Sequence, residues 1–144
     1  MIEVAMVFDR EGRAIFWPAP QGSAGSIPDD RSLWDVLWEN RYNLGGVAHT
    51  HPWDCPASPS GTDITTFAAI EAGLGQKLTW PIVTMTHVGF FVAVSMLDQG
   101  RSRTEYHDLN KYVRSEIGFV GFEPNDLWKQ QIEELRRRSR NEGV

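Results

Sequence analysis

The stretch that decides the fold reads Gly45-Gly46-Val47-Ala48-His49-Thr50-His51-Pro52, and Ser60-Gly61-Thr62-Asp63 follows it. The small and β-branched residues that precede His49 predict a buried strand. Side chains on a strand repeat with a period of two, so His49 and His51 share a face only where the backbone is extended. The stretch therefore predicts a strand that delivers two imidazoles from its carboxyl end.

The second part of the stretch predicts the start of a helix. Ser60 and Asp63 have the serine-to-acid spacing of a capping box, and apolar residues at helical spacing follow them. We expect the helix to run from Thr62 to about Leu74 and to end at Gly73 or Gly75. Asp63 then lies in the first turn, with its carboxylate free to face the histidines. Two imidazoles and one carboxylate suit a single zinc ion.

Taken together, H-x-H-P, seven further residues and S-x-x-D resemble the signature of the JAMM metalloproteases, also called the MPN-plus domain. The resemblance implies that His49, His51 and Asp63 hold a catalytic Zn²⁺ and that Ser60 helps to hold a tetrahedral intermediate. It covers roughly residues 1 to 100. It implies an α/β fold of the three-layer α+β type, in which helices flank a mixed, curved β-sheet, as in cytidine deaminases.

The family also takes its general base, a glutamate, from an early strand, because a metal-activated water must pass its proton to the leaving amine. Glu3 is the candidate here, since it opens the strand-like run from residue 2 to 8. Glu11 lies in the turn expected between strands at 2–9 and 13–17, and Glu39 lies late in a helix and faces water. Many family members follow the glutamate with G-x-L, whereas this chain continues differently.

Other proteins that use H-x-H fit less well. A metallo-β-lactamase run requires an Asp-His pair where Trp53 and Asp54 stand, and a cupin requires a glutamate between His51 and Glu71. An amidohydrolase barrel needs about 250 residues. An ordinary helix cap explains Ser60 and Asp63 but leaves the paired histidines without a role.

The composition indicates a single domain spanning residues 1–144, with 101–144 as a C-terminal helical extension. The net charge of −5 argues against nucleic acid as a partner. No apolar run reaches the roughly 18 residues of a membrane span, and the first residues do not read as a signal peptide. Cys55 is the only cysteine, so we expect a cytoplasmic protein without an internal disulfide, and a homo-oligomer stays open.

Elsewhere the pattern predicts further elements. A helix capped by Asp29 or Asp30 should bury a stripe of apolar side chains, and a hairpin should join strands at 79–86 and 89–97. A short strand at 103–106 and a helix at 108–116 should follow. The stripe of the first helix consists of Leu33, Trp34, Leu37 and Trp38.

The last element predicted is a terminal helix starting at Asn125 or Asp126. Trp128, Ile132 and Leu135 share one of its faces, which would dock on the sheet or on a second subunit. The arginine-rich residues 136–140 should form its solvated end, where positive charge suits the helix dipole.

These features predict an enzyme that hydrolyses a peptide or isopeptide bond. The resemblance implies a protein or peptide substrate, including ubiquitin-like or sulfur-carrier proteins, and the compact chain looks more like the prokaryotic or phage type. Substrate choice would depend on loops at 18–28 and 53–59, where Trp53 and Cys55 lie beside the expected groove. The alternative is a catalytically inactive scaffold or protein-interaction module of the same fold.

Overall fold

The structure is a computed structural model, which describes residues 2–19, 31–52, 56–108 and 126–140. Within these ranges it contains a six-stranded mixed sheet of order β2-β1-β3-β4-β5-β6 and three helices, an α+β arrangement. Only β3 and β4 pair in parallel among these strands, and helix α2 connects them. The elements are β1 (Ala5–Asp9), β2 (Ala14–Phe16), α1 (Arg31–Glu39), β3 (Leu44–Thr50), α2 (Gly61–Leu74), β4 (Thr79–Val83), β5 (Val88–Asp98), β6 (Arg101–Asp108) and α4 (Asp126–Ser139).

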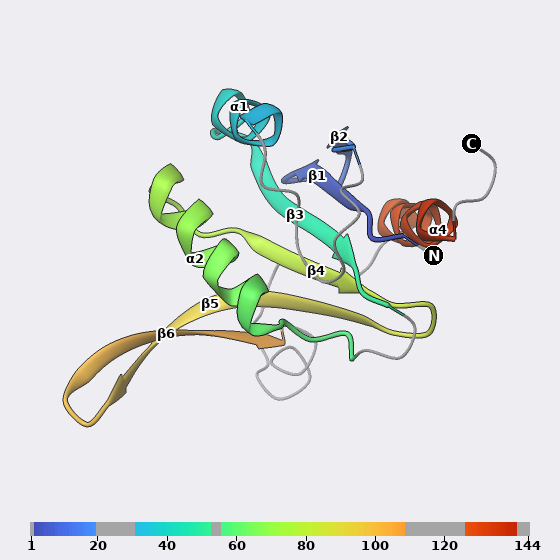
Figure 1. Cartoon of the computed structure of the whole chain (residues 1–144). Coiled ribbons are helices and arrows are strands. Elements are labelled where there is room, and N and C mark those ends of the chain that lie inside the picture. Colours follow the sequence, from blue (N-terminus) through green and yellow to red (C-terminus); the bar gives the residue numbers. More distant parts are fainter. Residues whose placement is uncertain (1, 20–30, 53–55, 109–125, 141–144) are drawn as a thin grey trace.

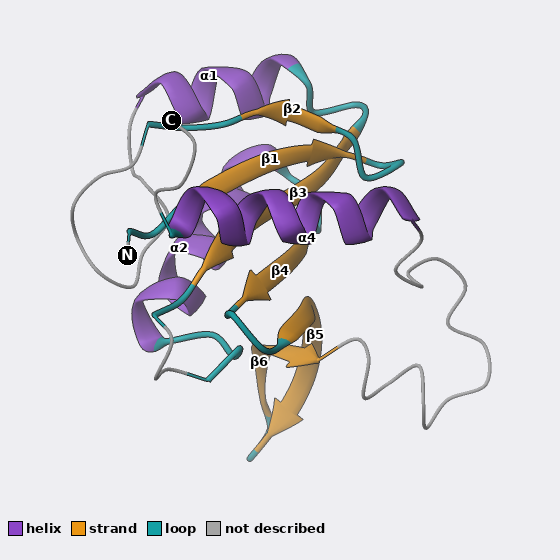
Figure 2. Ribbon diagram, turned by 90° about the vertical axis from the view of Figure 1, so that its right-hand side faces the viewer, coloured by secondary structure: helices purple, strands orange, loops and turns teal. Residues whose placement is uncertain are grey.

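The elements form three layers (Figures 1 and 2). Helices α1 and α2 cover one face of the sheet, where Phe67 stacks on Trp80 at 4.2 Å between ring centroids. Helix α4 covers the other face, where Trp128 meets Phe8 edge-on at 4.7 Å. Alternate residues of β1 pack into the hydrophobic cores on the two faces of the sheet, as the side-chain period of a strand requires. The sheet is therefore buried on both faces in its centre.

The first hairpin is present, but its first strand is shorter than predicted. Asp9 Oδ1 accepts hydrogen bonds from the backbone N–H groups of Glu11 and Arg13, which forms the predicted turn. Strand β1 begins at Ala5 and not at Ile2. The backbone of residues 2 and 4 is instead bonded to Ser139 and Thr50.

The second hairpin is also present, with shifted ends. Strand β4 ends at Val83, because Thr84 turns the chain by accepting hydrogen bonds on Oγ1 from the backbone of Thr86 and His87. Strand β6 covers 101–108 and not only 103–106, since it pairs with β5 along its whole length. Figure 1 shows this long hairpin extending beyond α2.

Helix α1 buries only half of its predicted stripe. Leu33 and Leu37 are buried in the core, whereas Trp34 and Trp38 are 37% and 44% exposed. The tryptophans stack on each other, and the Arg41 guanidinium lies 4.0 Å from the Trp38 ring. A helix resting on a sheet buries one i, i+4 row, and residues 34 and 38 belong to the next row around the helix. Glu39 is exposed, as expected.

Helix α4 docks on the sheet of its own chain through Trp128, Ile132 and Leu135, which settles the choice between sheet and second subunit for this face. Its arginine-rich end is not simply solvated, so that part of the prediction was wrong. Arg136 Nε donates to the Thr84 carbonyl oxygen at 2.8 Å, and the Arg138 guanidinium lies 3.8 Å from the Trp17 ring. The charged heads of these arginines thus anchor the helix to neighbouring segments.

Several predictions concern residues outside those that the structure describes. These are the caps Asp29 and Asp30, residues 20–28 of the predicted loop, the loop residues Trp53 and Cys55, and the predicted helix beyond its first residue, Asp108, which ends strand β6 instead. Among the described helices, none is both long and apolar enough to cross a lipid bilayer.

Candidate metal centre

The parallel unit β3-α2-β4 positions the predicted ligands. His49 is the last residue but one of β3, and His51 follows the end of the strand, with its backbone N–H donating to the Val83 carbonyl oxygen at 3.0 Å. This bond keeps the backbone extended beyond the end of β3, so both imidazoles share one face. Helix α2 then returns over that face and brings Asp63 in its first turn to the histidines.

The predicted capping box is confirmed in both halves. Ser60 Oγ accepts the backbone N–H of Asp63 at 3.1 Å, and Asp63 Oδ2 accepts the backbone N–H of Ser60 at 2.9 Å. The helix begins at Gly61, one residue before the prediction, and Gly75 in the left-handed region ends it. We expected the Asp63 carboxylate to be free, but the cap fixes it. The carboxylate nevertheless faces the histidines, as predicted.

The three predicted ligands meet in one buried cluster. His49 Nε2 lies 3.0 Å from His51 Nε2, and His51 Nε2 lies 2.9 Å from Asp63 Oδ2. His49 Nε2 lies 3.2 Å from Asp63 Oδ1, without the alignment of a hydrogen bond. The side chains are almost fully buried. Ligand atoms about 2.0–2.1 Å from a tetrahedral zinc are about 3.3 Å apart, so small outward movements would accommodate the ion.

Hydrogen bonding around His51 also fits a cation. His51 Nδ1 lies 3.1 Å from the Pro56 carbonyl oxygen, which can only accept, so Nδ1 carries the hydrogen. A neutral ring then directs the lone pair of Nε2 toward a carboxylate oxygen and a second imidazole. This contact is favourable only if the ring is an imidazolium or if a cation lies between the groups. The Nδ1–H···O=C bond is the usual outer support of a metal-binding histidine.

Two further buried atoms of the cluster, Asp63 Oδ1 and His49 Nδ1, make no hydrogen bond with any of the described residues. Buried polar atoms in proteins are nearly always paired, so an unpaired carboxylate oxygen beside an imidazole nitrogen needs an explanation. A metal held by Asp63, His49 and His51 would supply one for the carboxylate.

The electrostatics of the cluster favour an ionised carboxylate. Burial raises the pKa of Asp63, but the close contacts of its carboxylate with the His49 and His51 rings and the hydrogen bond from the Ser60 backbone outweigh it and hold the pKa far below its usual value. Burial lowers the pKa of His51, yet its bonds to Asp63 and Pro56 and the charges of Asp63 and Glu3 raise it overall. The site thus stabilises positive charge beside Asp63.

Glu3 lies at the edge of this cluster. Ala5 pairs with His49, and Thr50 N–H donates to the Val4 carbonyl oxygen at 2.9 Å, so the antiparallel alignment continues and sets Glu3 opposite His51. The period of two puts Glu3 on the same face as the histidines. Its Oε1 atom is buried, and its charge acts on the His51 ring. The candidate base and the candidate ligands therefore come from the same region.

Sequence reasoning missed the supporting residues. The Pro56 carbonyl contributes through the backbone, Gly89 through close approach and Thr50 through a hydroxyl that meets a distant backbone N–H, and the spacing of side chains reveals none of these. The proline after His51 and the threonine between the histidines were visible, but nothing in their spacing assigned them a contact.

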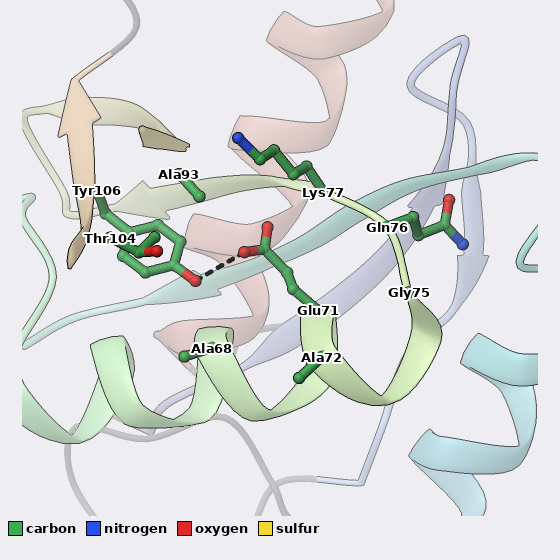
Figure 3. A pocket seen from close by; sticks show the side chains of 9 residues that line it. All are labelled: Ala68, Glu71, Ala72, Gly75, Gln76, Lys77, Ala93, Thr104 and Tyr106. Atoms are coloured by element: carbon green, nitrogen blue, oxygen red, sulfur yellow. Dashed lines mark hydrogen bonds between the residues drawn. The ribbon is translucent and has the colours of Figure 1, made fainter. Parts of the chain in front are cut away.

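A separate hollow of about 330 Å³ lies between the second half of α2 and strands β5 and β6 (Figure 3). Glu71 points into this region, where its Oε1 accepts the Tyr106 hydroxyl at 2.8 Å. Its Oε2 accepts the Leu78 backbone N–H and the Trp80 indole N–H. The Glu71 carboxylate in the hollow thus connects helix α2 to the sheet by hydrogen bonds.

Comparisons with protein-family models and with curated proteins found no match to this chain.

Proposed function

We propose that this protein is a zinc-dependent hydrolase of the JAMM type, which cleaves a peptide or isopeptide bond. The observation that carries the proposal is the meeting of His49, His51 and Asp63 in one buried cluster that a cation would satisfy. The three-layer arrangement with a mixed sheet supports the same proposal, because it is compatible with the architecture that the resemblance implies.

Three protein ligands leave room for a fourth position, as in catalytic zinc sites. Zinc held by these residues would supply Lewis acidity, polarising the scissile carbonyl and lowering the pKa of its water. The donor set of two neutral imidazoles and one carboxylate is one that zinc accepts readily.

The chain's own residues then have distinct roles. Glu3 takes a proton from the attacking water and returns it to the leaving amine. Ser60 uses its oxygen to accept the helix-capping hydrogen bond, so its O–H can donate to the developing oxyanion. Asp63 keeps its ligand geometry because the cap restrains the carboxylate. Pro56 holds the His51 ring in the tautomer that presents Nε2.

We propose a ubiquitin-like or sulfur-carrier protein, or a peptide, as the substrate class, on the resemblance alone. A protease of this kind would bring an extended segment of the substrate to the zinc, with the scissile bond between Glu3 and Ser60. Within the family, we propose the prokaryotic or phage type, on the resemblance alone.

The first test is elemental analysis of the purified protein beside a His49→Ala/His51→Ala variant. We expect about one zinc per chain in the unmodified protein and its loss in the variant. His87→Ala is the matched control, because His87 is an exposed histidine in the β4–β5 turn. Absence of metal even after zinc is supplied would overturn the metal centre and favour the scaffold alternative.

Hydrolysis needs a second test. Glu3→Gln should keep zinc while losing cleavage of ubiquitin-like fusions and of model peptides, since a neutral amide cannot take the proton. Unaltered cleavage by that variant would remove Glu3 from the mechanism.

A further inference from the structure

The segment that carries Glu3 lies outside the sheet ladder, yet its backbone is held on both sides. Strand β1 begins only at Ala5, and beyond its start the alignment with β3 continues in the bond from the Thr50 N–H to the Val4 carbonyl oxygen. The flanking residues Ile2 and Val4 are bonded through both their N–H and their C=O groups. Glu3 is the residue between these two anchors.

The first anchor comes from the last residue of α4. Ile2 N–H donates to the Ser139 carbonyl oxygen at 2.8 Å, and Ser139 Oγ donates to the Ile2 carbonyl oxygen at 2.6 Å. Ser139 is fully buried. Figure 1 shows the first residues of the chain next to α4. A buried serine that closes a two-bond ring with a distant backbone fixes that backbone strongly, because either group left alone would be unsatisfied.

The second anchor comes from the residue between the two histidines. Val4 N–H donates to Thr50 Oγ1 at 2.9 Å, and Thr50 N–H donates to the Val4 carbonyl oxygen at 2.9 Å. Thr50 is also fully buried. Strand β3, which carries Thr50, and helix α4, which carries Ser139, therefore hold the same three-residue segment from its two ends.

We propose that Ser139 is a positioning residue for Glu3, acting through Ile2 and together with Thr50. This inference rests on the proposed role of Glu3 as the base of the hydrolase. Helix α4 thereby contributes to the site without touching the ligands, and its end determines where the Glu3 carboxylate lies. Proton transfer depends steeply on such placement, and an error of about 1 Å can lower a rate about a hundredfold.

The test uses Ser139→Ala, which removes one bond of the first anchor. Ile132→Val is the matched control, because it trims the buried face of the same helix without touching Ile2. Near-UV circular dichroism establishes that both variants are folded. Thr50→Val removes the acceptor of the Val4 N–H. If Ser139→Ala does not fold, this variant tests whether the second anchor positions Glu3.

The first measurement needs no metal. Amide hydrogen exchange of Val4 in the metal-free protein should become about tenfold faster in Ser139→Ala than in Ile132→Val, because the segment opens locally. Equal exchange in the two variants would overturn the anchoring by Ser139.

The second measurement follows the carboxylate itself. With cobalt in place of zinc, paramagnetic relaxation of the ¹³C-labelled Glu3 carboxyl reports its distance from the metal. We expect Ser139→Ala to keep cobalt affinity, to weaken this relaxation and to lower kcat about tenfold with little change in KM. Ser139→Ala should not change whatever residual rate of cleavage the Glu3→Gln variant retains.

The two proposals fail separately. If the unmodified protein binds neither zinc nor cobalt, the proposed hydrolase is wrong, while the exchange experiment still decides the anchoring. If cobalt binds but relaxation of Glu3 and kcat are the same in Ser139→Ala and Ile132→Val, the hydrolase stands and Ser139 is not a positioning residue.

Discussion

Gly89 on β5 lies against the carbonyl oxygen of Ala57, so close that a Cβ atom at position 89 would overlap that oxygen. The same loop supplies the Pro56 carbonyl that accepts the His51 Nδ1–H. The absence of a side chain at position 89 of β5 therefore permits the loop to reach the position from which it orients the candidate ligand His51.

Gly89→Ala should weaken metal binding by about tenfold to a hundredfold, the range found when the outer support of a metal-binding histidine is lost. The measurement is competition with a zinc chelator. Gly61→Ala is the control, because a Cβ atom there meets nothing within 4 Å. Equal zinc affinity in the two variants would show that the loop does not depend on Gly89.

Asp63→Asn should separate the ligand role of Asp63 from its capping role. The amide oxygen can still accept the Ser60 N–H, so helix α2 should persist, as circular dichroism would show. Loss of the carboxylate charge should lower zinc affinity more than about a hundredfold, beyond the effect of outer-shell changes. Retention of full affinity, measured by calorimetry, would remove Asp63 from the ligand set.

Ser60→Ala should reduce both stability and rate while leaving the three ligands present. Loss of the cap bond to the Asp63 N–H should lower the free energy of unfolding by about 1 kcal/mol. Loss of an oxyanion donor should lower kcat by about 10²–10³-fold. Urea denaturation and steady-state kinetics measure the two effects. A fall in stability with unchanged kcat would restrict Ser60 to the cap.

Zinc should stabilise the folded protein, since the three ligands come together only on folding. At free zinc of one hundred times the dissociation constant, the gain in free energy of unfolding should be about 2.7 kcal/mol. Thermal unfolding with zinc and with a chelator measures it. The His49→Ala/His51→Ala variant should melt at the same temperature under both conditions, and an equal zinc effect in that variant would place the ion elsewhere.

Tyr106→Phe should make stability less sensitive to alkaline pH. Burial and the hydrogen bond to Glu71 raise the pKa of Tyr106 in the folded state. Its stabilising contribution is therefore complete below the unfolded value near pH 10 and is lost as the pH rises above it. At pH 7 the substitution should lower the free energy of unfolding by about 1–2 kcal/mol.

Denaturant titrations at pH 7 and pH 11 measure this difference. Tyr42→Phe is the control, since Tyr42 is 79% exposed. If Tyr106→Phe lost as much stability at pH 11 as the unmodified protein, the bond to Glu71 (Figure 3) would not govern the alkaline limb.

The amino-acid sequence alone determined those features that depend on local chemistry. The capping box of Ser60 and Asp63 and the glycine at which α2 ends are set within a few residues. Strand period and helix capping act over such short spans, so the order of elements and the three candidate ligands followed from the residues themselves.

Tertiary structure decided what depends on register and packing. Only the pairing of β1 with β3 brings Glu3 opposite His51, and only the end of α4 supplies Ser139 to hold it. The exposure of Trp34 likewise depends on which row of α1 rests on the sheet. The contacts that hold the segment around Glu3 join residues far apart in the chain, and in each of them at least one partner is a backbone group that every residue carries. No side-chain pattern can encode them, and they form only when the layers of the fold close.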